Sequence, residues 1–339
     1  MIMNKIALKI LAVSCFCISQ TMAIAQNTPI QYPYQFKSDG NPIISHIYTA
    51  DPSARVFNGK LYLYPSHDRD SAQWWDMTDW HVFSTSDFKN WKDYGIALAL
   101  TDTKWAKKYA WAPDCGYKNG KYYFYFPTDA NYIGVAIGDR PEGPFKDPLG
   151  APLITRQTPG VKNTRDFIDP CIFTDDDGKS YLFFGQLDVC ALELNDDMIS
   201  FSKPAVIVKG TSHFFEAIWM HKYKGKYYLS YSGKERPEDS DKIMYAVSDN
   251  VLGPYTYKGV ILDAVNSGTN HHSIVKYKGK WMLFYHNSDF AMKNIPANSP
   301  DRKYVQWRRS VCADYLYYNK DGTIQKVIPT RIGVSEIRR

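Results

Sequence analysis

Acidic side chains recur at one position of a repeated sequence pattern. Five segments share a short apolar run, a turn ending in Gly-Lys and a strand rich in Tyr and Phe. Eight or nine residues before the turn glycine, these segments carry in order Asp51, Trp111 or Ala112, Asp169, Glu216 and His271. Two carboxyl groups of different pKa that face one pocket beside aromatic rings are suited to hydrolysis of a glycosidic bond. The pattern therefore predicts a carboxylate-based hydrolytic site.

Glu216 differs from the two aspartates in its surroundings. It lies in FFEAIW among apolar neighbours, which predicts a raised pKa and a retained proton near neutrality, as a general acid requires. Asp51 and Asp169 are each followed by proline, and the alternative interpretation is that they are turn residues introducing a strand. The matching register of the three acids favours a shared site.

The elements that position these residues are predicted to be β-hairpins. Tight turns built on Asn-Gly or Asp-Gly between apolar runs are typical of hairpins, and the turn glycines are Gly59, Gly120, Gly178, Gly225 and Gly279. Further strand-like pieces lie between the hairpins, at 79–86, 132–139, 189–195 and 242–249. About four strands in each repeat of roughly 50 residues is the size of a propeller blade.

We therefore expect an all-β, five-bladed β-propeller over residues 26–339. In a propeller the first strand of each blade lines the central channel, so equivalent strand starts converge on one mouth. The C-terminal piece 305–327 is expected to return and pair with the first or last blade, because an open blade edge promotes aggregation.

Composition and the N-terminus limit the class of protein. With 44% hydrophobic and 22% charged residues the chain is predicted to fold, and a net charge of +6 without a basic block argues against nucleic-acid binding. Residues 1–25 place Lys5 and Lys9 before an apolar stretch that ends in Ala-Ile-Ala, the pattern of a secretory signal peptide. No other stretch is apolar enough to span a bilayer. The expected location is periplasmic or secreted, with lipid anchoring through Cys15 or Cys17 as an alternative.

The remaining cysteines do not indicate a metal site. Cys115, Cys171, Cys190 and Cys312 have spacings that match no zinc motif. Export permits disulfides, but buried free thiols fit a chain of this size equally well, and the sequence assigns no pairs.

Several motifs together resemble glycoside hydrolase family 43. They are ADPS, YAWAPD, FIDP, the Glu of FFEAIW, TNHHSIV and the closing RRSVCADYLYYNKDGTI, which span nearly the whole chain after residue 25. Members of this family are five-bladed propellers that act on plant polysaccharides containing arabinose and xylose. The resemblance implies inversion at the anomeric carbon, with Asp51 as general base, Glu216 as general acid and Asp169 as the acid that orients Glu216 and tunes its pKa. Inversion calls for two carboxyl groups about 6.5–9.5 Å apart with water between them.

The same resemblance suggests substrate-binding residues. Trp111 in YAWAPD is similar to the aromatic wall of the family's sugar subsite, the alternative being a core tryptophan between blades. Arg308 and Arg309 lie on a probable strand, so alternation sends only one toward the channel. We expect Arg309 to contact substrate and Asp51, and Arg308 to be solvated. Trp74 and its neighbour Trp75 follow the first hairpin and are expected at the rim, unless they are ordinary blade contacts.

His271 resembles a family histidine that lies near a bound calcium ion in several members. Imidazole is an unusual calcium ligand, so a calcium ion here would be coordinated mostly by water, and a purely hydrogen-bonding histidine is the alternative. Two other polar clusters look structural. The run Asp175–Gly178 lacks the spacing of a calcium loop and is interpreted as a turn, and His67, Asp68 and Asp70 are interpreted as a solvated loop.

Three functions remain open at this point. The first is an exo-acting enzyme that removes terminal α-L-arabinofuranosyl or β-D-xylosyl units from hemicellulose or pectin oligosaccharides. The second is an endo-α-1,5-L-arabinanase, and the third is a non-catalytic glycan-binding propeller. Residues 286–306 and the segment after Trp74 are long enough to wall off a pocket, which favours exo action. The lack of the C-terminal β-sandwich of many family xylosidases favours arabinofuranosidase or dual activity.

Overall fold

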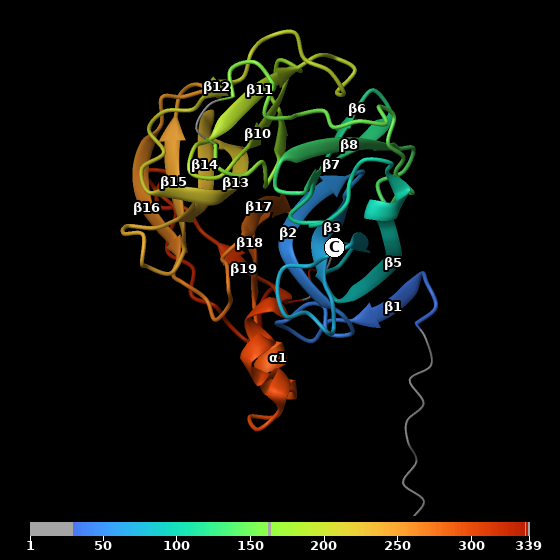
Figure 1. The fold of residues 1–339 in the computed structure, drawn as a ribbon. Helices are drawn as coiled ribbons and strands as arrows, with labels where there is room; N and C mark the ends of the chain where they lie inside the picture. Colours follow the sequence, from blue (N-terminus) through green and yellow to red (C-terminus); the bar gives the residue numbers. More distant parts are fainter. Residues whose placement is uncertain (1–29, 162–163, 336, 338–339) are drawn as a thin grey trace, which may run out of the picture. The chain divides into compact units, whose positions relative to one another are not determined.

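Each of the five repeated hairpins begins an antiparallel sheet (Figure 1). The computed structural model describes residues 30–161, 164–335 and 337, so the signal peptide expected at 1–25 lies outside the described residues. All strands among the described residues belong to one compact unit that begins at residue 32. Among the described residues, no helix is both long and apolar enough to cross a membrane.

The sheets are five blades, which confirms the predicted propeller. Blade 1 has the order β1 (Tyr34–Lys37), β5 (Asn90–Ala99), β4 (Asp79–Thr85), β3 (Lys60–Asp68) and β2 (Tyr48–Phe57). Blade 2 contains β6 (Asp114–Lys118), β7 (Lys121–Thr128) and β8 (Tyr132–Gly138). Blade 3 contains β9 (Cys171–Thr174), β10 (Ser180–Phe184), β11 (Cys190–Leu194) and β12 (Val206–Ile207).

The last two blades follow the same plan. Blade 4 contains β13 (Phe214–Tyr223), β14 (Lys226–Gly233), β15 (Lys242–Ser248) and β16 (Thr256–Leu262). Blade 5 contains β17 (His272–Tyr277), β18 (Lys280–Asn287) and β19 (Ser310–Leu316). Short helices complete the described chain, namely η1 (Leu100–Asp102), α1 (Asp289–Asn294) and η2 (Pro300–Trp307). The expectation of about four strands per repeat is therefore met on average, with three to five in individual blades.

The predicted closure of the ring is confirmed and uses both ends of the propeller. Strand β19 pairs with β18 as the third strand of blade 5. The start of β2 and the segment before it hydrogen-bond to the β19 region, with Ile43 N donating to Val311 O at 2.8 Å and Thr49 N of β2 donating to Arg309 O at 2.9 Å. The first and last blades are thereby joined, and the edge of β19 is covered.

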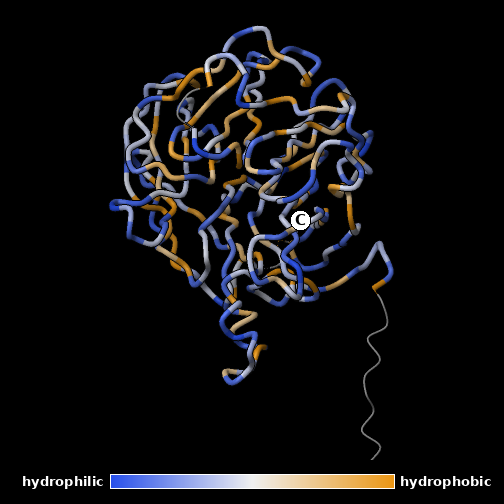
Figure 2. The backbone as a smooth tube through the Cα atoms, in the orientation of Figure 1, coloured by the Kyte–Doolittle hydropathy of each residue, from blue (hydrophilic) through white to orange (hydrophobic). Residues whose placement is uncertain are grey.

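The apolar core lies between neighbouring blades. Figure 2 shows that hydrophobic stretches concentrate in the strands while many connecting loops are hydrophilic. Between blades 1 and 2, the fully buried Trp80 packs on Phe124 and Phe126 with ring centroids 5.7 and 5.3 Å away. Such contacts account for the high aromatic content, because flat blades are held together by large rings. We expect truncation of Trp80 to alanine to cost about 3–5 kcal/mol.

A cluster of side chains links the inner strands across the middle of the propeller. Arg55 of β2 forms an ion pair with Asp114 of β6 and donates to Ile172 O of β9 at 2.8 Å. Its guanidinium lies 4.1 Å above the ring of Trp219 on β13, whose indole N–H donates to Ile274 O of β17 at 2.8 Å. All five inner strands are linked at this level.

Candidate active site

A pocket of about 440 Å³ is located where the inner strands begin. This volume is ordinary for a small-molecule site. All the residues found by counting back from the turn glycines line it, namely Asp51, Trp111, Ala112, Asp169, Glu216 and His271. The convergence expected from the repeat is therefore observed.

Local backbone irregularities turn the carboxylates into the pocket. The β2–β3 register shifts between Ala50 and Ser53, around Asp51, and the β13–β14 register shifts on both sides of Glu216. Asp51 and Asp169 have φ values of 49° and 54°, and Ala217 beside Glu216 has a φ of 62°. Positive φ is strained for residues other than glycine, and bulges and strain of this kind gather at functional sites.

Asp51 is held in its ionised form. Burial raises its pKa, but the Arg309 guanidinium, whose Nη1 donates to Oδ1 at 3.0 Å, and the Ser66 hydroxyl, which donates to Oδ2 at 2.7 Å, lower it to about 2. His286 supports the backbone here, because its Nδ1 accepts from the Asp51 N–H at 3.0 Å while Nε2 contacts Thr269 O at 2.9 Å. This arrangement assigns the neutral Nε2–H tautomer to His286. An ionised carboxylate is what a general base requires.

Arg309 is fixed by a second carboxylate, that of Asp68. The guanidinium donates from Nε to Asp68 Oδ2 and from Nη2 to Oδ1, both at 2.8 Å, and the Arg309 backbone N–H also donates to Oδ2 at 2.9 Å. Asp68 is almost fully buried at the end of β3. Its assignment to a solvated loop was therefore wrong, because a charged group that follows a hairpin can be the buried partner of a distant arginine. Asp70 is exposed as expected.

Of the two neighbouring arginines, Arg309 reaches the pocket and contacts Asp51, as expected. Arg308 is outside the set of residues that line the pocket. It is also buried rather than solvated, with Nη1 3.1 Å from Asp301 Oδ2 of η2. That part of the expectation was wrong, because neither arginine lies on a strand: β19 begins at Ser310, and Arg308 directly follows η2, whose Asp301 pairs with it.

Glu216 has the opposite character to Asp51. Burial and the nearby charges of Asp169 and Asp241 raise its pKa to about 8, although Gln186, which donates from Nε2 to Glu216 Oε2 at 2.6 Å, favours the ionised form. The residue as a whole is only 8% exposed. At neutral pH it carries a proton that it can donate, as predicted from its apolar sequence context.

Asp169 lies between Glu216 and His271. Its Oδ2 accepts from the backbone N–H of Ala217 at 2.6 Å, which fixes the residue next to the general-acid candidate. Its Oδ1 lies 3.7 Å from Nε2 of His271. Asp169 is thus placed to act on Glu216 both through its charge and through the adjoining backbone.

The surroundings of His271 do not fit a direct calcium ligand. Its Nδ1 accepts from the His272 backbone N–H at 2.8 Å, so the ring proton is on Nε2, which is buried without a hydrogen-bond partner. Burial lowers the pKa of His271, but the Asp169 carboxylate outweighs this effect and raises it. Calcium takes six to eight oxygen ligands, whereas this imidazole presents an N–H to Asp169. The contacts favour a hydrogen-bonding role.

Aromatic rings form one wall of the pocket. Trp111 stacks on Tyr109 with centroids 4.7 Å apart, and its indole N–H donates to Trp75 O at 2.8 Å. Trp74 is 41% exposed and lies 6.0 Å from the Trp111 ring, and Trp74 and Trp75 both line the pocket. The rim position expected for Trp74 and Trp75 is observed, and Trp111 faces the pocket rather than being buried between blades.

The long segment 286–306 contributes to the wall only indirectly. None of its residues lines the pocket. Helix α1 projects below blade 5 (Figure 1), and its Phe290 makes an edge contact with Tyr48 of blade 1 at 6.1 Å. The segment supports the wall through Gln306 of η2, whose backbone carbonyl accepts from Gly268 N at 3.2 Å. The adjoining Trp307 makes an edge contact with Trp75 at 6.0 Å.

Sequence reasoning missed three polar residues at the site for which a simple signal exists. In an antiparallel hairpin, residues equally distant from the turn are neighbours, so the count can also run forward from the turn glycines. Eight or nine residues after Gly59, Gly178 and Gly225 are Asp68, Gln186 and Lys234. Asp68 holds Arg309, and Gln186 and Lys234 line the pocket. Asp241, whose Oδ1 is 3.1 Å from Lys234 Nζ, lies on a loop and has no such signal.

The four cysteines within the described residues are buried and form no disulfide. This agrees with one of the two alternatives left open by the sequence. The run Asp175–Gly178 is the predicted turn, with Gly178 N donating to Asp175 O at 2.9 Å.

Comparison with known proteins gives consistent matches. Residues 40–324 match the family described as glycosyl hydrolases family 43. The chain is 38% identical to xylosidase/arabinosidase 43A of Humicola insolens, over 84% of this chain and 98% of that protein. A similarity confined to 45% of this chain, at 29% identity, is found with extracellular endo-α-(1→5)-L-arabinanase 2 of Bacillus subtilis.

Solved structures agree with these relatives. The α-L-arabinofuranosidase of Clostridium thermocellum is 42% identical, with a TM-score of 0.73, and the match covers 88% of this chain and 98% of that one. A β-xylosidase/α-arabinofuranosidase from a compost microbial metagenome, solved with xylotriose in a calcium-free form, is 37% identical with a TM-score of 0.74. This match covers 87% of this chain and 98% of that one.

Proposed function

Because the chain belongs to glycosyl hydrolase family 43, we propose that it is an inverting exo-glycosidase that releases α-L-arabinofuranosyl or β-D-xylosyl units from plant oligosaccharides. The observation that carries this proposal is the contrast between two buried carboxyl groups in one pocket. Asp51 has a pKa lowered to about 2, and Glu216 has a pKa raised to about 8. Between these values one group is a base and the other an acid, which is the division of roles that hydrolysis requires.

The proposed reaction is a single displacement at the anomeric carbon. Asp51 accepts a proton from a water molecule as the water oxygen forms a bond to that carbon. The bond between the carbon and the leaving oxygen breaks, and Glu216 donates its proton to that oxygen. The products are a free pentose of inverted anomeric configuration and the shortened oligosaccharide, which carries a hydroxyl group at the former linkage. Proton exchange with solvent then restores both carboxyl groups.

Other pocket residues position the reactants in this proposal. Arg309 keeps Asp51 ionised, Asp169 raises the pKa of Glu216, and Gln186 and the Nε2–H of His271 are available to sugar hydroxyl groups. The wall formed by Trp111 and Trp74 stacks on the sugar face. Arg308 does not contact substrate in this proposal. Its ion pair with Asp301 of η2 holds its side chain outside the pocket.

Substrate class is supported by the relatives. Xylosidase, arabinosidase and arabinofuranosidase names accompany matches that cover most of this chain, whereas the endo-arabinanase match covers less than half of it. Exo action on both pentoses is therefore favoured over endo action. The retained carboxyl groups argue against a non-catalytic glycan-binding propeller.

This proposal contains no direct ligation of calcium by His271. A relative was solved in a form described as calcium-free, but in this chain His271 directs its ring proton, rather than a lone pair, toward Asp169. Export remains part of the proposal. Residues 1–25 are proposed to be a signal peptide that directs the chain to the periplasm or the medium, and N-terminal sequencing of the protein recovered from cells tests the cleavage after Ala25.

The function is tested by measuring hydrolysis of aryl α-L-arabinofuranosides, aryl β-D-xylosides and linear arabinan. We expect release from at least one aryl glycoside by the wild-type chain and a loss of about 10²–10⁴-fold in the Glu216→Gln variant. Proton NMR of the first-formed sugar reports the inverted anomer. Cleavage of arabinan into oligomers with both aryl glycosides untouched would replace the exo proposal by the endo one, and no hydrolysis of any substrate would overturn both.

A further inference from the structure

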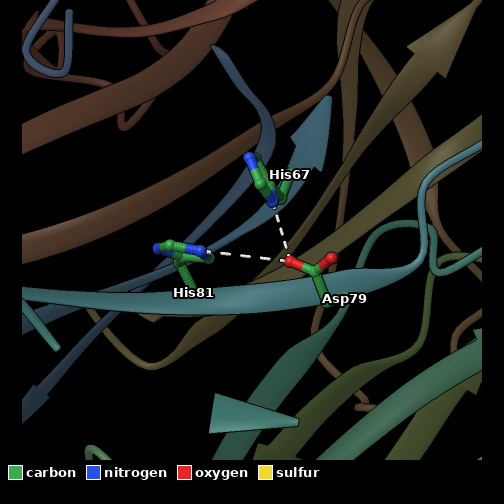
Figure 3. A group of neighbouring side chains, drawn as sticks. All are labelled: His67, Asp79 and His81. Carbon is green, nitrogen blue, oxygen red and sulfur yellow. Dashed lines mark hydrogen bonds and ion pairs between the residues drawn. The ribbon is translucent and has the colours of Figure 1, made fainter. Parts of the chain in front are cut away.

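A cluster of two histidines and one aspartate lies on blade 1, outside the pocket. His67 is near the end of β3, and Asp79 and His81 are at the start of β4 (Figure 3). Each offers one ligand atom, and the three atoms lie within 4.8 Å of one another. None of these residues lines the active-site pocket.

The strand register builds this cluster. Ser66 pairs with Trp80 across β3 and β4, so the next residue on each side places His67 opposite Asp79. His81 follows Asp79 by two residues and therefore projects from the same face of β4. The observed contacts agree with this placement, since His67 Nδ1 lies 2.7 Å and His81 Nε2 lies 4.0 Å from the same oxygen, Oδ1 of Asp79.

The orientation of His81 is set by a carboxylate behind it. His81 Nδ1 lies 3.1 Å from Oδ1 of Asp93 on β5, which assigns the ring proton to Nδ1 and leaves the Nε2 lone pair directed at Asp79. Two acceptors that face each other at 4.0 Å are too far apart for a hydrogen bond and have space for a cation between them. A carboxylate that holds the far nitrogen of a histidine is the usual support for a metal-ligating imidazole.

Asp93 is itself firmly held. Its carboxylate contacts Nε2 of His46 at 2.9 Å and accepts from the Gly95 backbone N–H at 2.8 Å, and its side chain is fully buried. The ring of Tyr32 packs edge-on against His81 with centroids 5.4 Å apart. The side chains of His67 and Asp79 are 22% and 13% exposed, so an ion from solvent can reach them.

We propose that His67, Asp79 and His81 form a binding site for a divalent transition cation of the zinc type. Two imidazole nitrogens and one carboxylate oxygen, with a fourth position open to water, form a common donor set for Zn²⁺. The same set is a poor match for calcium or magnesium, which take oxygen ligands. Binding displaces the proton that His67 shares with Asp79, and the bound ion clamps β3 to β4 in blade 1.

The test measures binding of Zn²⁺ to the untagged, chelator-treated chain by calorimetry and by native mass spectrometry. We expect one Zn²⁺ per chain, a raised melting temperature in its presence and no comparable effect of Ca²⁺. Co²⁺ serves as a spectroscopic probe, since histidine ligation gives it a visible absorption band. His67→Gln with His81→Gln, and separately Asp79→Asn, should abolish stoichiometric binding while circular dichroism confirms folding. Asp93→Asn should weaken affinity by about 10–100-fold.

Matched variants locate the ion. His213→Asn removes an exposed histidine of the loop before β13, and Glu216→Gln alters the active site, and both should bind Zn²⁺ as the wild type does. Loss of binding in Glu216→Gln would place the ion in the pocket and overturn the proposal. Absence of stoichiometric Zn²⁺ in the wild type, or its retention in both the folded double-histidine and Asp79→Asn variants, would also overturn it.

Discussion

Arg309 donates a hydrogen bond to Asp51 at 3.0 Å, and both side chains are buried. Asp51 belongs to β2 in blade 1, whereas Arg309 immediately precedes β19 in blade 5. The base of the proposed reaction therefore takes its ionised state from a residue at the other end of the propeller. The contacts between blades 1 and 5 that close the ring therefore also bring Arg309 to Asp51 and complete the site.

The first prediction concerns the acid limb of the pH–activity profile. Arg309→Met removes the cation that lowers the pKa of Asp51 to about 2, while the burial that raises it remains. The pKa of Asp51 should rise, so kcat/KM should begin to fall at a higher pH on acidification than in the wild type. Arg308→Gln, outside the pocket, is the control and should leave this limb in place. An unchanged limb in a folded Arg309→Met variant would contradict the role of the pair.

The basic limb should respond in opposite directions to two substitutions around Glu216. The charge of Asp241 raises the pKa of Glu216 toward about 8, and the hydrogen bond from Gln186 lowers it. Asp241→Asn should therefore move the basic limb of kcat/KM to lower pH, and Gln186→Leu should move it to higher pH. A shift of the basic limb in the same direction in both variants would show that Glu216 is not the titrating acid.

A third prediction links the general acid to stability. The pKa of Glu216 rises from 4.5 to about 8 on folding, so the folded state binds more protons than the unfolded state between these pH values. Stability should fall as pH rises through this window. Glu216→Gln removes this dependence, so it should raise the melting temperature at pH 8 but not at pH 4. The corresponding gain in the free energy of unfolding at pH 8 has an upper limit of about 5 kcal/mol. Equal effects at both pH values would argue against a buried, protonated carboxyl.

Trp111 should contribute more to substrate binding than Trp74. The Trp111 ring is held by stacking on Tyr109 and by a hydrogen bond to Trp75 O, whereas Trp74 is 41% exposed. Trp111→Ala should lower kcat/KM on aryl glycosides by about 5–30-fold, the effect of 1–2 kcal/mol. Trp74→Ala should have a smaller effect. Steady-state kinetics that rank the two residues in the reverse order would place the sugar nearer the rim.

Activity should not depend on calcium. His271 directs an N–H toward Asp169 and offers no lone pair to a cation. Treatment with a chelator that binds calcium should leave kcat/KM unchanged, and added Ca²⁺ should have no effect on the treated enzyme. Restoration of lost activity by Ca²⁺, with no effect of Zn²⁺, would contradict this prediction and would place a calcium ion in the pocket without His271 as a direct ligand.

The fold and the three carboxyl groups of the site could be predicted because each hairpin turn fixes how many residues separate the turn from the start of its strand. Counting from Gly59, Gly178 and Gly225 located Asp51, Asp169 and Glu216 correctly in the pocket, since antiparallel pairing preserves the count on every blade. The number of strands in each blade was less certain, because the outer strands follow loops of variable length.

The remaining site residues depend on contacts between distant parts of the chain. Asp68 looked like part of a solvated loop because its partner, Arg309, is 241 residues away. Arg308 looked solvated because the sequence does not show that η2 covers it. Asp241 acts on Glu216 across the pocket from a loop, and no periodic signal reveals such an electrostatic contact.

Ring closure also has a consequence for how the protein is made. Asn41 and Ala313, which hydrogen-bond across the closure, are 272 residues apart, and contacts of such long range slow folding. While the ribosome is still translating blade 4, the partner strand of the earliest segment does not yet exist. The nascent chain must therefore leave its opening blade unsealed until β19 has emerged, so the propeller reaches its final form only after the strands of blade 5 have been synthesised.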